Sequence, residues 1–200
     1  MALTASTMLA LGTKAPDFQL TEVSSGEQIS LHDFDDKKAL LIMFICRHCP
    51  FVKHIQGQLS SLAKDYSGSG LAMAAISSND AAKYPDDSPE SLSSMARQLG
   101  FSFPLLYDET QAVAQAFTAA CTPDFFLFDR NRQLVYRGQL DDSRPGNGKP
   151  LTGSDLREAI DAVLADKPIS PNQKPSIGCN IKWQPGNEPS YFLQNPLWQT

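Results

Sequence analysis

The spacing of hydrophobic residues changes along the chain, and each change separates a strand from a helix. The continuous apolar run Leu40–Ile45 predicts a central strand that is buried on both faces. After Pro50 the apolar residues recur at helical spacing, which predicts a helix to about Tyr66 with one buried stripe. That stripe consists of Val52, Ile55, Leu59 and Leu62. The run Leu71–Ser77 predicts a second buried strand.

The rest of the pattern continues this alternation. Ser88-Pro89-Glu90 predicts a helix start, because an N-cap, a proline at the first position and an acid all suit that end of a helix. Gly100 ends this helix. Further strands are predicted at 18–20, 28–31, 103–107, 124–128 and 134–137, and further helices at 108–117 and 152–164. This order predicts an α/β protein with a three-layer α/β/α sandwich.

The two ends of the chain differ from the middle in composition and in expected structure. Residues 1–11 are mildly apolar without a basic start, so we expect a flexible N-terminus instead of a signal peptide, and a cytoplasmic, reducing setting. One domain is predicted over residues 12–166. Residues 167–200 hold six prolines and both tryptophans, Trp183 and Trp198. We expect an irregular tail that packs on the domain or on a second copy in a homodimer.

Composition narrows the function classes. With 200 residues, 42% of them hydrophobic and 20% charged, the chain is expected to fold around one core. The 17 basic and 22 acidic residues give a net charge of -5, and no basic surplus points to nucleic acid. The longest apolar run, Ala39–Cys46, is far shorter than a bilayer requires, so no membrane span is predicted.

The candidate chemistry lies in Cys46-Arg47-His48-Cys49-Pro50, which follows a buried strand and opens a helix. A thiolate at a helix N-terminus is favoured by the unpaired backbone N–H groups and the dipole, and by positive charge on Arg47 and His48. We therefore expect Cys46 to be an exposed nucleophile of low pKa, and Cys49, one turn deeper, to resolve its mixed disulfide. No cofactor and no metal are predicted.

Two other interpretations of this pair stay open. One is a zinc site that uses both cysteines with one or both of His48 and His54, although the sequence shows no second C-x-x-C or H-x-x-H pair to complete four ligands. The other is a pair of inert structural cysteines. His54 lies off the apolar stripe and is expected to be solvated.

A second candidate segment is Cys121-Thr122-Pro123, directly before a predicted strand. A proline that opens a strand is tolerated, and a bond before proline is where cis peptides occur. A cis-proline loop beside the cysteine pair would offer backbone groups of Thr122 and Pro123 to an extended substrate chain.

Taken together, these segments resemble the thioredoxin superfamily, in particular the redoxin (AhpC/TSA-type) branch and its peroxiredoxin-like group. The resemblance runs over about residues 12–183. It is carried by Lys14-Ala15-Pro16-Asp17-Phe18, the C-R-H-C-P segment, Tyr84-Pro85-Asp86-Asp87-Ser88-Pro89, Cys121-Thr122-Pro123-Asp124-Phe125-Phe126, Tyr136-Arg137-Gly138, Asp141-Asp142-Ser143-Arg144-Pro145 and Ser176-Ile177-Gly178-Cys179.

The resemblance implies a thioredoxin-like fold with an N-terminal β extension, a redoxin-type insertion between Ser88 and Tyr107, and a cis-proline at Pro123. It also implies that Cys121 lies beside the cysteine pair as a third redox thiol or a buried small residue. Cys179, in the tail, is a further redox thiol or a packed residue.

Thioredoxin has a buried aspartate, which acts as a proton acceptor, six residues before its first cysteine. By this resemblance the same position in this chain is Leu40. Asn79 or Asp80, at the end of the second strand, would have to substitute for that aspartate, or else simply begin a loop.

Three functions follow as hypotheses. The first is a thiol-disulfide oxidoreductase that acts on protein or small-molecule disulfides and thiols. Its cysteine pair is expected to be more oxidising than a cysteine pair that encloses a neutral dipeptide. The second is an antioxidant thiol peroxidase that uses Cys49 or Cys46, since the peroxidatic cysteine of peroxiredoxins matches Cys49. The third is a redox-inert binding module with a thioredoxin-like shape.

Overall fold

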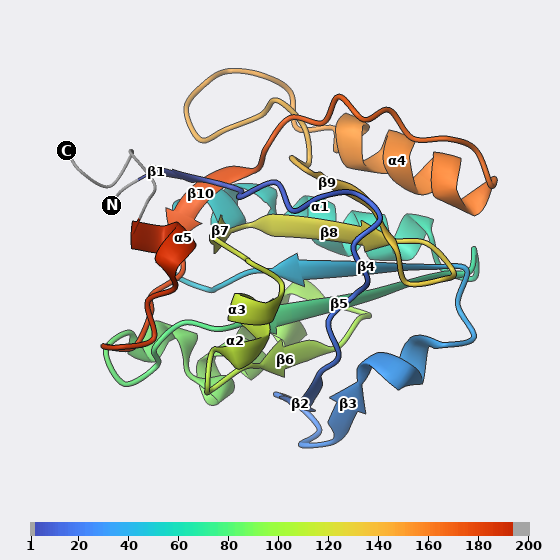
Figure 1. The fold of residues 1–200 in the computed structure, drawn as a ribbon. Coiled ribbons are helices and arrows are strands. Elements are labelled where there is room, and N and C mark those ends of the chain that lie inside the picture. The colour runs from blue at the N-terminus through green and yellow to red at the C-terminus, as the bar shows by residue number, and fades with distance from the viewer. Residues whose placement is uncertain (1–2, 194–200) are drawn as a thin grey trace.

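The computed structural model describes residues 3–193, and its centre is a sheet of seven strands (Figure 1). Their order is β3-β2-β6-β5-β4-β8-β9. The bounds are β2 Gln19–Glu22, β3 Gln28–Ser30, β4 Ala39–Phe44, β5 Leu71–Ser77, β6 Leu105–Tyr107, β8 Asp124–Phe128 and β9 Leu134–Gly138. The central strands β4, β5 and β6 are parallel, and β8 runs antiparallel to β4. All six residues of β4 are buried, as its continuous apolar sequence predicts.

Helices cover both faces of this sheet, so the predicted three-layer sandwich is confirmed. The helices are η1 Leu31–Phe34, α1 Pro50–Asp65, η2 Pro85–Asp87, α2 Pro89–Leu99, α3 Ala112–Ala116, α4 Ser154–Leu164 and α5 Ser190–Leu193. Buried side chains of α1, α2 and α4 share one core cluster with Leu41 and Met43 of β4. The other face carries α3 and η1, packed against Leu40, Ile42 and Phe44.

A second, small sheet joins the two ends of the chain to the domain. Its order is β1 (Leu3–Ala5), β10 (Ile177–Asn180) and β7 (Cys121–Thr122), with β10 in the middle (Figure 1). The prediction of a flexible start is therefore wrong for residues 3–5. Thr4 is buried, and the hydroxyl of Ser6 donates to Asp124 at 2.8 Å. The segment is thus held by residues far along the chain, which a local sequence pattern does not predict.

The tail beyond residue 166 also has more order than its prolines suggest. Besides β10 it contains α5, and Trp183 is 8% exposed with edge-on contacts to Tyr191 and Phe192. This part of the tail thus packs on its own domain, while Trp198 lies outside the described residues. Over residues 3–193, none of the helices combines the length and the apolar character that a membrane crossing requires.

Candidate active site

The two cysteines lie where β4 ends and α1 begins. The strand emerges from the core, and residues 45–49 form the connection to the helix. Cys49 is the N-cap of α1 and Pro50 stands at its first turn, where a missing backbone N–H costs nothing. The strand–C-x-x-C–helix context that the sequence predicts is therefore present, and Pro50 serves to start the helix.

Both sulfur atoms are buried against the loop that contains Pro123. Cys46 is 1% exposed and Cys49 is not exposed at all. The Cys46 Sγ atom lies 3.3 Å from the Thr122 hydroxyl, and the Cys49 thiol donates to the Thr122 carbonyl at 3.2 Å. Thr122 thus contacts both sulfur atoms. The expectation of an exposed Cys46 is wrong, because the Thr122 loop covers it.

The expected order of acidities is reversed as well. Burial raises the pKa of Cys46 well above that of an ordinary thiol, and its contact with Cys49 and the carboxylate of Asp87 act in the same direction. Hydrogen bonds from Cys179 and from Cys46 lower the pKa of Cys49, with help from the backbone of Val52 at the helix start. Cys49 is therefore the more acidic thiol of the pair, and Cys46 the less acidic one.

Asp87 explains why the dipeptide between the cysteines does not lower the pKa of Cys46. Its buried carboxylate accepts hydrogen bonds from the backbone N–H groups of Arg47 and His48 at 2.7 and 3.3 Å. It also pairs with His48 Nδ1 at 2.5 Å and accepts from Asn79 at 2.7 Å. The guanidinium of Arg47 turns to the Ser91 carbonyl at 3.1 Å. The charge that acts on Cys46 is therefore the Asp87 carboxylate, and the lowering of the Cys46 pKa that was expected from Arg47 and His48 is wrong.

The sequence did not predict Asp87 as a residue of the site. Burial alone would raise its pKa, but hydrogen bonds from His48 and Asn79 outweigh burial and hold the pKa below its usual range. The carboxylate, a ring nitrogen of His48 and the sulfur of Cys46 all lie within 4.8 Å of one another. Asn79 supports Asp87, whereas Asp80 accepts backbone bonds from its own loop. Asp87 lies in the segment Tyr84–Pro89, which carried part of the family resemblance and could have indicated that Asp87 belongs to the site.

The loop before β8 has the predicted cis peptide, between Thr122 and Pro123. A buried ion pair holds this loop in place. Asp124 accepts from Arg137 at 3.2 Å and from the backbone N–H of Ala120 at 3.2 Å, and both charged side chains are fully buried. Arg137 also lies over the ring of Phe126, 4.4 Å from its centroid. The loop is thus fixed on both sides of the cis bond.

The backbone edge of Thr122 is already occupied in the structure. Strand β10 pairs with β7 in antiparallel fashion, with Cys179 opposite Thr122 and Asn180 opposite Cys121. We expected this edge to hold an extended substrate chain, but the tail of the protein itself takes that position. The approach is close, because a Cβ atom added to Gly178 would lie 2.1 Å from the Thr122 carbonyl oxygen.

The two remaining cysteines differ in their relation to the pair. Cys179 is 3% exposed, and its side chain hydrogen-bonds to Cys49. The thiol of Cys121 instead reaches the Pro123 carbonyl at 3.5 Å, and burial raises its pKa well above the ordinary value. The structure therefore brings Cys46, Cys49 and Cys179 together and turns Cys121 to its own loop.

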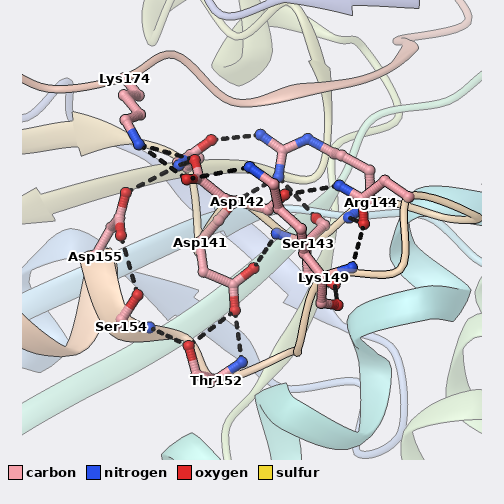
Figure 2. A network of polar contacts seen from close by, with 11 residues as sticks. Asp141, Asp142, Ser143, Arg144, Lys149, Thr152, Ser154, Asp155 and Lys174 are labelled. Carbon is pink, nitrogen blue, oxygen red and sulfur yellow. Dashed lines mark hydrogen bonds and ion pairs between the residues drawn. The ribbon is translucent and has the colours of Figure 1, made fainter.

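A polar network holds together the segment between β9 and α4 (Figure 2). Asp141 accepts from the backbone N–H groups of Thr152 and Gly153 at 2.7 and 2.6 Å, and Arg144 donates to the Asp141 carbonyl at 2.6 Å. Ser143 binds His54 at 2.9 Å, so His54 is not the solvated residue that we expected. These bonds close the loop beside the start of α1 and explain the Asp141–Pro145 motif.

The zinc interpretation changes with these positions. Among the described residues, Cys46, His48 and Asp87 are the set of three whose ligand atoms come together. Neither Cys49 nor His54 belongs to it, since Cys49 faces Cys179 and His54 faces Ser143. Asp87 already accepts four hydrogen bonds there. The predicted ligand set is therefore not assembled.

Known proteins resemble this chain at several levels. A profile described as the AhpC/TSA family matches residues 11–137. The thiol-disulfide oxidoreductase ResA of Geobacillus kaustophilus (strain HTA426) is 26% identical over 132 residues, which make up 66% of this chain and 70% of that protein.

Among solved structures, an uncharacterized conserved protein from Geobacillus kaustophilus is 55% identical with a TM-score of 0.91, covering 93% of this chain and 98% of that one. The thioredoxin domain of a thiol-disulfide oxidoreductase from Bacteroides vulgatus is 18% identical with a TM-score of 0.61, covering 78% of this chain and 99% of that domain. The fold is therefore thioredoxin-like.

Proposed function

Since the chain belongs to the AhpC/TSA family, we propose that it is a thiol-disulfide oxidoreductase with Cys46 and Cys49 as its redox pair. One observation carries this proposal. Both sulfur atoms lie at the start of α1 within 3.3 Å of one residue of the cis-proline loop, Thr122. The similarity to ResA, whose name states this activity, supports it. The peroxidase alternative is not favoured, because the comparisons point to disulfide exchange.

The exchange consists of two displacements at sulfur. The Cys46 thiolate attacks one sulfur of a substrate disulfide, the substrate S–S bond breaks, and one substrate thiolate leaves. Cys49 then attacks the Cys46 sulfur, the mixed disulfide breaks, and the second substrate thiolate leaves. The substrate gains two electrons, and the enzyme ends with a Cys46–Cys49 disulfide. The direction reverses when the substrate is a dithiol.

The groups around Cys46 suit the first displacement. Burial raises the pKa of Cys46, so its thiol must give up a proton before attack. The ring of His48 lies within 4.8 Å of the sulfur and is paired with the Asp87 carboxylate, so His48 is the acceptor for that proton. In the second displacement Cys46 has no proton left to donate, but the hydrogen bond from Cys179 and the backbone of Val52 still lower the pKa of Cys49.

The partners in this proposal are protein or small-molecule disulfides and thiols. The chain itself contributes the sulfur atoms, so the proposal requires no cofactor. A homodimer through the tail and a reducing, cytoplasmic setting are further parts of it. Light scattering of the full chain checks the dimer, and a mass of one 21.9-kDa chain at working concentration would contradict it.

An assay of insulin reduction with dithiothreitol, together with a glutathione-linked assay, tests the activity. We expect Cys46→Ser and Cys49→Ser to reduce turnover to the uncatalysed rate. Cys121→Ala is the matched control, because its thiol is buried in the same region but faces the Pro123 carbonyl. Wild-type turnover that survives Cys46→Ser would end the assignment. Partner binding that persists without both cysteines would favour a redox-inert binding module instead.

A further inference from the structure

Strand β10 occupies the position in which a substrate strand would meet the redox pair. It pairs with β7 beside the cis-proline loop and places Cys179 directly opposite Thr122. The same residue, Thr122, contacts both Cys46 and Cys49 through its hydroxyl and carbonyl. Cys179 is therefore held where the cysteine of an extended substrate would lie.

Three of the cysteines gather around Thr122. Cys46 Sγ lies 3.3 Å from its hydroxyl, Cys49 Sγ lies 3.2 Å from its carbonyl, and Cys179 is its partner in the β7–β10 pairing. The pKa of Cys49 also responds to both of the other thiols. Disulfide exchange requires a central sulfur that is bonded to one partner and within reach of a second. Cys49 meets this condition, and Cys121 does not take part because its thiol faces the Pro123 carbonyl.

Cys179 is presented by a strand that is fixed on several sides. β1 pairs with β10 along its outer edge, as Figure 1 shows. The hydroxyl of Ser176 donates to the Gly138 carbonyl at 2.8 Å. Beyond the strand, the backbone N–H of Lys182 donates to the side chain of Asn79 at 2.8 Å. Because Asn79 also binds Asp87, the same residue anchors the tail and the acid beside Cys46.

We propose that Cys179 is a third redox thiol, and that the disulfide of the enzyme exchanges between Cys46–Cys49 and Cys49–Cys179. This inference rests on the proposed function for the origin of the first disulfide. The Cys179 thiolate attacks Cys49 Sγ, the bond between Cys49 and Cys46 breaks, and Cys46 leaves as a thiolate. The proton lost by Cys179 goes to Cys46, so atoms and electrons balance without an external oxidant or reductant.

The exchange has two consequences for the site. It returns Cys46 to the thiol form while the chain still holds the two oxidising equivalents. It also ties β10 covalently to the start of α1, so the oxidation state of the pair reaches the C-terminal segment. In the dithiol state the strand is held by hydrogen bonds and packing alone.

Disulfide mapping in a Cys46→Ser background tests the proposal. The folded variant is oxidised with oxidised glutathione, quenched in acid, digested without reduction and analysed by mass spectrometry. We expect a peptide pair joined through Cys49 and Cys179. A further Cys121→Ala substitution should leave its rate of formation within about twofold. The matched Cys179→Ala substitution should slow the formation of any intramolecular disulfide at least about tenfold.

Three results would overturn the proposal. One is a Cys46→Ser variant that stops at a glutathione adduct on Cys49 while Cys179 stays a thiol. Another is a Cys49–Cys179 bond that forms only in urea. The third is a wild-type protein that yields Cys46–Cys49 alone at every glutathione ratio. Circular dichroism melts of each variant, together with Cys179→Ser as a second substitution, show that the fold is retained.

The turnover assay separates this inference from the proposed function. Wild-type turnover together with no Cys49–Cys179 bond rejects the third thiol and leaves the oxidoreductase standing. A mapped Cys49–Cys179 bond in a protein without turnover rejects the oxidoreductase and leaves the third thiol standing.

Discussion

A single methyl group at Gly178 should release β10 from the redox pair. In Gly178→Ala the new Cβ would lie 2.1 Å from the Thr122 carbonyl oxygen and 2.7 Å from its carbon. Both are backbone atoms, so no side chain can turn away. The strand must move by at least about 0.9 Å before the first separation reaches 3.0 Å. The matched control is Gly57→Ala on α1, where nothing lies within 4 Å of the added atom.

The size of the effect follows from what this shift breaks. The β7–β10 pairing covers two residue pairs, and a displacement of about 1 Å takes backbone hydrogen bonds beyond their useful range. Each lost bond costs about 0.5–1.5 kcal/mol, so the attachment of β10 should weaken by about 1–3 kcal/mol. That corresponds to roughly a 5- to 150-fold larger population with β10 detached. Gly57→Ala should instead stabilise its helix by up to about 1 kcal/mol.

Alkylation by iodoacetamide at pH 7, resolved by cysteine in a mass spectrometer, measures this opening. In the wild type we expect slow reaction of Cys46 and Cys49, which are 1% and 0% exposed. Gly178→Ala should raise both rates by the factor above, and the turnover of insulin should rise more than that of oxidised glutathione. Rates within about twofold of the wild type would refute the reasoning, as would an equal increase in Gly57→Ala.

Other substitutions probe the charges around the site. Asp87→Asn removes the negative charge beside Cys46, so the pH profile of Cys46 alkylation should move to lower pH, and an unchanged profile would contradict the role of Asp87. Although burial opposes its ionisation, hydrogen bonds hold the pKa of Asp87 below 3.8, so its contribution to stability is present above that pH and lost as the pH falls further. Urea denaturation from pH 5 to pH 2 should therefore show a larger loss of stability in the wild type than in Asp87→Asn. Arg137→Ala leaves Asp124 buried without its ion partner and should cost about 3–5 kcal/mol in urea denaturation, whereas a loss below about 1 kcal/mol would show that water reaches the carboxylate. A redox titration should give a reduction potential above about -270 mV, because the lowered pKa of Cys49 stabilises the reduced form of the pair. A lower potential would contradict this reasoning.

Most of the central sheet could be predicted because its signals are local. The apolar run of β4, the helical stripe of α1 and the N-cap at Ser88 each depend on neighbours in sequence, and the structure places those elements within one or two residues of the prediction. The small sheet could not be predicted in this way. Strand β1 has three residues and β7 has two, which is too short for a period to show.

The environment of the sulfur atoms could not be predicted from local sequence either. The sequence indicates that Cys46 and Cys49 belong together, but their exposure and acidity depend on residues that arrive from far along the chain. Asp87 comes from η2, and Cys179 comes from the tail, opposite Thr122. Helix position and adjacent charge therefore suggested a low pKa for Cys46, whereas burial and a distant carboxylate decide it in the fold.

The proposed redox pair contacts Thr122 of β7, which pairs with β10, so the tail has a direct means of affecting the chemistry of the two sulfur atoms. Lys182 and Asp87 both bind Asn79, one through its oxygen and the other through its nitrogen. A movement of β10 that carries Lys182 away would therefore loosen the amide that helps to orient the carboxylate beside Cys46. The same movement withdraws Cys179 from Cys49 and so removes the largest contribution to the low pKa of that thiol. Displacement of one strand should thus expose both sulfur atoms and bring their acidities closer together, which is the change that an attack by Cys46 requires.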